Sequence, residues 1–277
     1  MGGFDHRHLA ATLYPAVLEA GRVEMRHFGA GGAVETKADR SPVTAADREA
    51  EAIIVAALAS IAPDVPVVAE EAIAAGHVPE RANRFFLVDA LDGTRLFVRG
   101  KPEFSVNIGL VENRQPVFGL IYIPPTSDLY VTLAAGESFR ATAPCAANAA
   151  LRFEDLVFTR LHARAPDLAN LKAFNSQTAG GASAEFLAAL KVRDATPVGS
   201  SLKFCLIAAG LGDIYARHGA TSEWDTAAGQ AILEAAGGSV TTLDGTSLTY
   251  GKADAKYLNP HFVAWGRGPI ISAVTAR

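Results

Sequence analysis

Apolar residues recur with helical spacing in two N-terminal segments. In residues 7–28 they fall at Leu9, Leu13, Val17, Ala20 and Val23. This stripe predicts a helix in which Pro15 marks a kink or a late start. After a glycine-rich break and a polar segment at 37–47, a second stripe follows at Ala50, Ile53, Ile54, Ala57, Leu58 and Ile61. It predicts a second amphipathic helix.

Two apolar runs typical of buried strands end at acidic residues. The run 85–88 ends at Asp89, and Asp92 follows three positions later. Two carboxylates buried together are costly, and a multivalent cation between them is the usual remedy. The shorter run 65–69 repeats the pattern at Glu70, for which a solvated loop carboxylate is the alternative.

The middle of the chain predicts strands followed by loops. Alternating apolar residues at 104–110 and an apolar run at 117–123 predict antiparallel strands. Residues 134–164 are alanine-rich and weakly patterned, and predict loops with a single short strand or helix. We place the division between two halves here, an N-terminal α+β half at 1–145 and a C-terminal α/β half at 146–277, which together form one compact unit.

The C-terminal half alternates helical and strand-like pieces. Helices are predicted at 182–190 and 201–211, and strands at 213–216, at 238–242 and from Phe262. An alanine-rich helix after Trp224 stops at Gly237, and Asp225 fits its N-cap. A carboxylate fixed at a helix start also suits a metal ligand, so both interpretations of Asp225 stand.

Asp47 likewise has two interpretations. Thr44 and Asp47 have the spacing of a capping box at the start of the second helix. Asp47 also shares the inward stripe with Ala50 and Ile54, which predicts a side chain that points into a site.

Composition narrows the class of protein. With 277 residues, 49% of them apolar, and a net charge of -4, the chain suits a soluble protein with small-molecule partners and no nucleic-acid polymer. Cys145 and Cys205 lie far apart, which fits a reducing compartment. No signal-peptide pattern or transmembrane run of about 18 apolar residues is present. We expect a cytoplasmic protein, with peripheral membrane association left open. The scattered histidines argue against a zinc enzyme.

Glu70, the segment 89–94, Trp224-Asp225 and the segment 235–238 together resemble the inositol monophosphatase superfamily of lithium-sensitive, Mg²⁺-dependent phosphatases. Further segments resemble the CysQ branch of 3'(2'),5'-bisphosphate nucleotidases, namely 41–44, 199–205, 223–229 and 258–262. The resemblance spans nearly the whole chain and is weakest at 134–180. It implies an α/β (α+β) fold, a layered αβαβα sandwich of the inositol monophosphatase and fructose-1,6-bisphosphatase kind, with the site where the halves meet.

The resemblance also implies a site with two or three Mg²⁺ ions. Glu70, Asp89 and the Leu91 carbonyl would hold one ion, while Asp89, Asp92 and Asp225 would hold the second. Hard oxygen ligands suit Mg²⁺, and paired ions stabilise both the attacking and the leaving oxygen of an in-line displacement.

In the same pattern, Thr94 and Asp47 orient the attacking water and accept its proton, with Glu70 close by. The amides of Gly93 and Thr94 would bind phosphate oxygens, since a glycine lets the backbone approach closely. A second phosphate would meet Ser200, Lys203 and Arg217. The alternative is that Lys203 and Arg217 are ordinary solvated side chains. All of these roles are implied by the resemblance.

The implied reaction is hydrolysis of the 3'-phosphate of 3'-phosphoadenosine 5'-phosphate, a by-product of sulfate assimilation, by a monomer or homodimer. A phosphatase of inositol phosphates or other sugar phosphates is the alternative within this chemistry. A non-catalytic module that binds phosphometabolites is the alternative of another class. Two positions depart from the pattern: Ala90 replaces the usual proline, and the segment 174–178 replaces a serine, arginine and histidine cluster.

Overall fold

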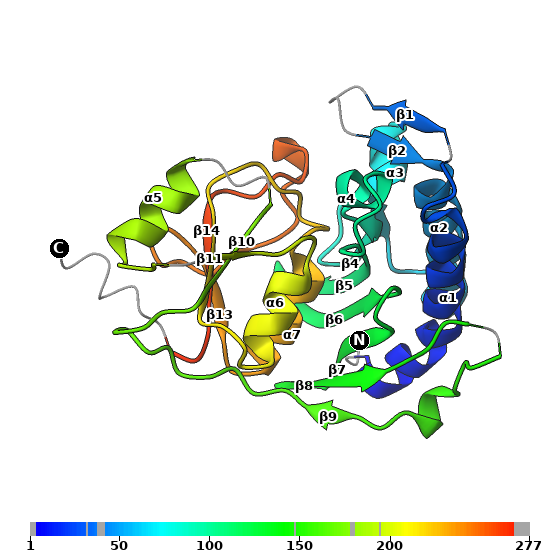
Figure 1. Cartoon of the computed structure of the whole chain (residues 1–277). Coiled ribbons are helices and arrows are strands. Elements are labelled where there is room, and N and C mark those ends of the chain that lie inside the picture. Colours follow the sequence, from blue (N-terminus) through cyan, green and yellow to red (C-terminus); the bar gives the residue numbers. More distant parts are fainter. Residues whose placement is uncertain are drawn as a thin grey trace.

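The computed structural model describes residues 4–31, 33–37, 42–146, 148–177, 181–193 and 195–268. Five layers alternate between helices and sheets (Figure 1). In order they are α1 (His6–His27) with α2 (Ala45–Ile61), a seven-stranded sheet, α6 (Leu202–Ala208) with α7 (Ala227–Ala235), a five-stranded sheet, and α5 (Gly181–Ala189). This order confirms the predicted layered αβαβα sandwich.

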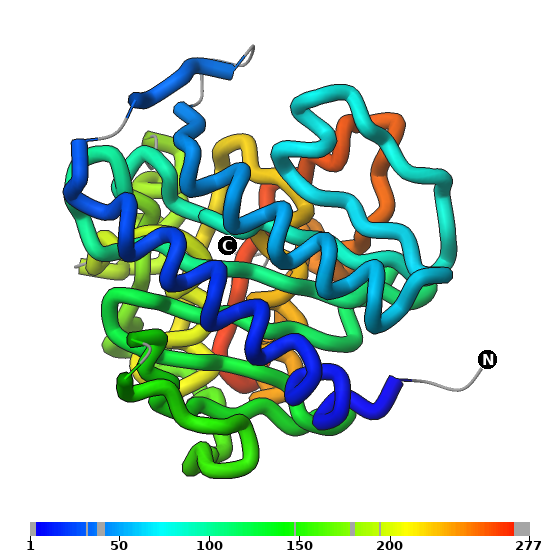
Figure 2. The backbone as a smooth tube through the Cα atoms, turned by 90° about the vertical axis from the view of Figure 1, so that its right-hand side faces the viewer, coloured from blue at the N-terminus to red at the C-terminus, as the bar shows by residue number. Residues whose placement is uncertain are grey.

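The outer helical layer matches the two apolar stripes. α1 and α2 run side by side across one face of the large sheet (Figure 2). The Asp5 side chain caps α1 by accepting from His8 N at 3.1 Å. Pro15 lies inside the helix, so the late start is wrong and α1 begins at His6.

The large sheet has the order β3-β4-β5-β6-β7-β8-β9. Its strands are Val67–Ala69, Arg84–Asp92, Ser105–Glu112, Gln115–Ile123, Asp128–Ala134, Glu137–Thr142 and Thr159–Arg160. β3 pairs in parallel with β4, and every other pairing is antiparallel. The predicted antiparallel pair β5–β6 is confirmed. It turns at Asn113 and Arg114, whose φ values of 49° and 68° fit a two-residue hairpin.

The second sheet has the order β11-β10-β12-β14-β13. Its strands, from β10 to β14, are Ala173–Asn175, Ala195–Pro197, Ile214–Arg217, Ser239–Thr242 and Phe262–Trp265. The last three confirm predicted strands. The prediction of loops with a single short element at 134–164 is wrong, because β8, a 3₁₀ turn at Phe153–Asp155 and β9 all lie there. β8 buries only the small Ser138 and Ala141, so its sequence carries little apolar alternation.

Helix α7 rests directly on strands β5 and β6. A Cβ atom on Gly119 would lie 2.2 Å from Ala228 O, and one on Gly109 would lie 2.9 Å from Ala227 Cβ. The glycines therefore let helix and sheet backbones touch, which fixes the start of α7 relative to the sheet.

Four short elements complete the frame around the site. They are β1 (Val34–Thr36), β2 (Pro42–Thr44), α3 (Glu70–Ala74) and α4 (Thr94–Val98). β1 and β2 form a hairpin that leads into α2. Within the described residues, no helix is long and apolar enough to cross a bilayer. Cys145 and Cys205 are both buried and free.

Candidate active site

A β-bulge brings Asp89 and Asp92 to the same side of the large sheet. Asp89 pairs with Asn107 and Asp92 with Ser105, so β4 holds one residue more than β5 between the two pairs. In a regular strand, residues three apart face opposite sides, and an extra residue reverses this. Both carboxylates therefore line the cavity between the sheet and α6.

Asp47 acts both as a cap and as a site residue. Its Oδ2 accepts from Thr44 N at 2.8 Å and from Thr44 Oγ1 at 2.7 Å, which completes the capping box of α2. Its Oδ1 accepts from Thr94 Oγ1 at 2.8 Å. The side chain is buried, and burial raises the pKa of its carboxyl. The two interpretations drawn from the sequence therefore hold at once.

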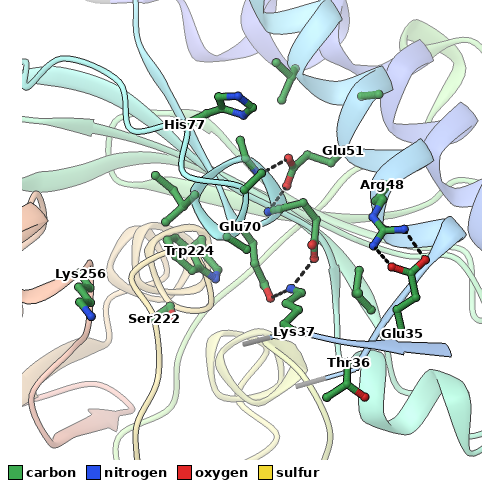
Figure 3. A pocket seen from close by; sticks show the side chains of 18 of the residues that line it. Glu35, Thr36, Lys37, Arg48, Glu51, Glu70, His77, Ser222, Trp224 and Lys256 are labelled. Atoms are coloured by element: carbon green, nitrogen blue, oxygen red, sulfur yellow. Dashed lines mark hydrogen bonds and ion pairs between the residues drawn. The ribbon is translucent and has the colours of Figure 1, made fainter. Parts of the chain in front are cut away.

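Glu70 follows β3 and begins α3, where it meets a lysine. Lys37 Nζ lies 2.5 Å from Glu70 Oε1 and 2.5 Å from Glu71 Oε1 (Figure 3). Burial disfavours the ammonium, but the two glutamates raise the pKa of Lys37 above its usual value. Burial in turn raises the pKa of Glu71 to about 7.

Asp225 lies at the turn that leads into α7. The N-cap is Thr226, so the prediction that Asp225 is the cap is wrong by one residue. Thr226 Oγ1 accepts from Tyr250 Oη at 3.1 Å and from Asn259 Nδ2 at 2.9 Å, which fixes the start of the helix. The Asp225 carboxylate accepts from Ser222 N at 2.8 Å and is left facing the cavity.

Three acids from three elements converge on one point. Ligand oxygens of Glu70, Asp89 and Asp225 all lie within 4.8 Å of one another. Burial and the neighbouring carboxylates raise the pKa values of Asp89 and Asp225 well above the usual range. When these carboxylates are ionised, the positive charge around them is too small to balance their negative charge. Their hard oxygens fit a divalent cation of the Mg²⁺ class.

Asp92 is held at the edge of this cluster by two polar side chains. Its Oδ2 accepts from Asn107 Nδ2 at 3.2 Å and from Ser201 Oγ at 2.9 Å. Ser201 Oγ also lies 2.8 Å from Asp225 O, so it ties β4 to the turn before α7.

Two cavities adjoin at the cluster. The smaller, of about 450 Å³, is lined by every site residue predicted from the sequence except Asp47, which reaches it through Thr94. The larger, of about 900 Å³, lies between α2, α3 and the β1–β2 hairpin, with Trp224 and Lys256 on its far side (Figure 3). Both are lined by Glu70, Ser222 and Leu258. Only the smaller holds Asp89, Asp92, Asp225 and Thr94, so it is the candidate reaction site.

The backbone at Gly93 needs a glycine. Its φ is 102°, and a Cβ atom would lie 2.8 Å from Glu103 O. Thr94 therefore begins α4 directly at the cavity, where its Oγ1 lies 3.2 Å from Leu91 O.

The predicted substrate residues Ser200, Lys203 and Arg217 line the same cavity. Lys203 is only 4% exposed, and its Nζ donates to Val198 O at 3.1 Å and to Ser200 O at 2.5 Å. Its alternative interpretation as a solvated cation is therefore wrong. Arg217 Nη2 donates to Ala220 O at 2.8 Å.

Lys37, Asn107 and Ser201, whose side chains contact acids of the site, were not predicted. Asn107 gave a signal, because it is a polar residue at an inward position of an otherwise apolar strand. Lys37 lies in a polar segment and Ser201 at the start of a predicted helix, and only the folded chain brings them to the acids.

Comparison with known proteins supports the geometry. Residues 5–265 match the inositol monophosphatase family. The 3'(2'),5'-bisphosphate nucleotidase CysQ of Escherichia coli strain K12 is 38% identical over 234 residues, which are 83% of this chain and 87% of that protein. The crystal structure of CysQ from Bacteroides thetaiotaomicron, a bacterial member of the inositol monophosphatase family, superposes with a TM-score of 0.75 at 31% identity, over 95% of this chain and 98% of that one. An IMPase from Thermotoga maritima superposes with a TM-score of 0.70 at 26% identity, over 95% of this chain and 93% of that one. The chain belongs to the inositol monophosphatase family.

Proposed function

We propose that this protein is a Mg²⁺-dependent phosphatase that removes the 3'-phosphate of a 3'(2'),5'-bisphosphate nucleotide such as 3'-phosphoadenosine 5'-phosphate. One observation carries the proposal: Glu70, Asp89, Asp92 and Asp225 meet beside the Thr94–Asp47 pair in a single cavity. The likeness to the CysQ nucleotidases selects the substrate class within this chemistry.

The acids divide into two overlapping ligand sets. We assign Glu70, Asp89 and the Leu91 carbonyl to one Mg²⁺ site, and Asp89, Asp92 and Asp225 to a second, with room left open for a third ion. Bound there, Mg²⁺ lowers the pKa of water and stabilises the charge on the attacking and leaving oxygens.

Thr94 and Asp47 are suited to receive a proton. Thr94 Oγ1 donates its own hydrogen to Asp47, so its lone pairs remain available to an attacking water. When Thr94 Oγ1 takes up a proton from the water, its own hydroxyl hydrogen can pass to Asp47. The raised pKa of Asp47 makes it a better base than an ordinary aspartate. Glu70 borders the same space and is placed to orient the water.

We assign the reacting phosphate to the turn at Gly93. Gly93 has a left-handed backbone, and both Gly93 and Thr94 line the cavity. We assign the amides of Gly93 and Thr94 to phosphate oxygens. Ser200, Lys203 and Arg217 are assigned to the leaving group, with Lys203 acting through the Ser200 loop that it holds.

Phosphate release from adenosine 3',5'-bisphosphate and from inositol 1-phosphate, measured at equal Mg²⁺, tests the proposal. We expect kcat/KM to be clearly higher for the nucleotide. A preference for inositol 1-phosphate would assign the site to sugar phosphates. Binding of both ligands without Mg²⁺-dependent hydrolysis would show a phosphometabolite-binding module without turnover.

A further inference from the structure

We propose that Arg95 and Arg99, on the rim of the smaller cavity, bind a second phosphate carried by the leaving group of the substrate. This inference rests on the proposed phosphatase function and names the side chains that distinguish a bisphosphate from a monophosphate.

The charge distribution in the cavity calls for such a subsite. The acids that face the reacting phosphate are Glu70, Asp89, Asp92 and Asp225. Cations bound to these acids serve the phosphate that is cleaved. A second phosphate, set apart from the first by the sugar, must find its positive charge on the protein. Basic side chains line the cavity at four positions, namely Arg95, Arg99, Lys203 and Arg217.

Lys203 is already engaged by the protein. Its ammonium donates to the carbonyls of Val198 and Ser200 and lies 5.0 Å from the centre of the Tyr215 ring. With 4% of the residue exposed, the ammonium holds the Ser200 loop in place and offers little surface to a ligand.

Arg217 is partly engaged. One Nη donates to Ala220 O, and Nε is buried without a hydrogen-bond partner in the described part of the chain. A guanidinium in this position presents no open pair of N–H groups on its Nε edge. Phosphate can then meet only its two Nη groups, one of which already donates to Ala220 O.

Arg95 and Arg99 differ from both. Each is exposed, and neither makes an ion pair or side-chain hydrogen bond with any residue in the described ranges. They are four positions apart at α4, a spacing that places side chains side by side, where like charges repel. An anion bound between them replaces this repulsion with attraction, and the guanidinium fork matches phosphate geometry.

The position of α4 fits the leaving-group side of the cavity. Leu96, between the two arginines, packs against the Ser200 loop so closely that a Cβ atom on Gly199 would lie 2.4 Å from Leu96 Cδ1. Ser176 and Gln177, which line the same cavity, are polar but uncharged. Within the described wall, the free positive charge near the Ser200 loop is therefore that of Arg95 and Arg99.

The test measures a preference ratio: kcat/KM for adenosine 3',5'-bisphosphate divided by kcat/KM for adenosine 3'-monophosphate, at fixed Mg²⁺ and ionic strength. We expect Arg95→Gln and Arg99→Gln each to lower this ratio about tenfold, and the double variant to lower it further, since hydrogen bonds to charged groups are the strong ones. The loss should appear in KM for the bisphosphate. Arg95→Lys, which keeps the charge but not the fork, should lower the ratio less than Arg95→Gln.

Arg152→Gln is the matched control, because Arg152 is an exposed arginine that pairs with Asp155 outside both cavities. Its ratio should equal that of the wild type, and circular dichroism should show all variants folded. An unchanged ratio in the folded double variant would overturn the assignment of Arg95 and Arg99.

Failure of the proposed function has a different signature. If the wild type hydrolyses inositol 1-phosphate in preference to both nucleotides, the nucleotidase proposal fails. The arginine assignment is then decided by the same ratio taken between inositol 1,4-bisphosphate and inositol 1-phosphate. A ratio that falls in the double variant supports the subsite, and one that does not fall refutes it.

Discussion

A single carboxylate can stabilise a helix and face a reaction site, as Asp47 does with its two oxygens. Local sequence could not choose between these roles because the capping box accounts for only one oxygen. The other oxygen is claimed by Thr94, which is 47 residues away in sequence. The capping role and the site role of Asp47 are therefore compatible, because each uses a different carboxylate oxygen.

Replacement of Asp92 by asparagine is expected to abolish turnover. Asparagine keeps the size of the side chain and its contact with Ser201, but loses the charge that we assign to the second Mg²⁺. The loss in kcat should exceed the ~10–100-fold effect typical of residues that only support a metal ligand. Mg²⁺-dependent phosphate release measures the loss of turnover, and circular dichroism checks that the variant is folded. Near-normal activity would refute the ligand assignment.

Glu24 predicts a pH effect on stability. It is fully buried in α1, and neither carboxyl oxygen has a partner among the described residues. Burial, together with Asp47 and Cys145, raises the pKa of Glu24 well above its usual value. The folded state therefore keeps a proton that the unfolded chain releases above about pH 4.5. The contribution of protonated Glu24 to the stability of the fold is fully present below that pH and is lost as the pH rises toward the pKa of Glu24 in the folded state.

We expect the unfolding free energy of Glu24→Gln, relative to that of the wild type, to increase by ~1.4 kcal/mol per pH unit above about pH 4.5. Glutamine resembles the protonated acid and does not titrate. Urea unfolding of both proteins between pH 4.5 and 7.5 measures the difference, in which the acids of the metal cluster cancel. Parallel pH profiles would show that Glu24 is ionised in the folded protein.

At the scale of elements, the helices and the central strands follow from periodicity, but the bulge in β4 does not. The apolar run before Asp89 predicts the strand and says nothing of an extra residue between Asp89 and Asp92. The bulge is defined by the register of β4 against β5, which local sequence does not specify. β8, β10 and β11 were missed for a related reason, since they are short or bury small residues that carry a weak pattern.

The contact of α7 with the sheet predicts a strong effect of Gly119→Ala. The added Cβ would lie 2.2 Å from Ala228 O, so helix or strand must shift. We expect a loss of about 1–3 kcal/mol in unfolding free energy. Activity should fall as well, because Asp225 precedes α7. Gly181→Ala is the matched control, since its Cβ would meet nothing closer than 3.8 Å. Equal stability of the two variants would contradict the close contact.

For the whole molecule, the acid cluster predicts that Mg²⁺ stabilises the fold in a pH-dependent way. Without metal, the raised pKa values of Asp89 and Asp225 mean that these acids contribute to the stability of the fold at low pH, and that this contribution is lost as the pH rises. Mg²⁺ binds the ionised acids of the folded state and restores the lost stability. We expect a larger rise in Tm on adding millimolar Mg²⁺ at pH 8 than at pH 5.5, where protons compete. EDTA should reverse the shift, and an equal rise at both pH values would argue against these ligands.

Inhibition by Li⁺ is a further expectation at this scale, and it rests on family membership. Millimolar Li⁺ should lower phosphate release at fixed Mg²⁺, whereas the same concentration of K⁺ should not. Insensitivity would set this chain apart from the lithium-sensitive members of its family.

The sequence predicted the layered fold and the four acids that line one cavity, Glu70, Asp89, Asp92 and Asp225, because their order and spacing match a known pattern. It did not predict how the walls around them are built. Lys37, Asn107, Ser201 and the exposed pair Arg95 and Arg99 acquire their meaning only from neighbours that are distant in sequence. The division into 1–145 and 146–277 stays a prediction.

The glycine contacts of α7 also determine where the site can open. With no side chain between α7 and Gly109 or Gly119, the helix that follows Asp225 packs directly on β5, the neighbour of the strand that carries Asp89, and we expect this part of the site to be stiff. Exchange of substrate and phosphate must then depend on the other walls, where β1 and β2 present Lys37 to the acids. In hydrogen–deuterium exchange, the amides of α7 and β5 should be the slowest to exchange, and those of β1 and β2 should exchange faster by several orders of magnitude.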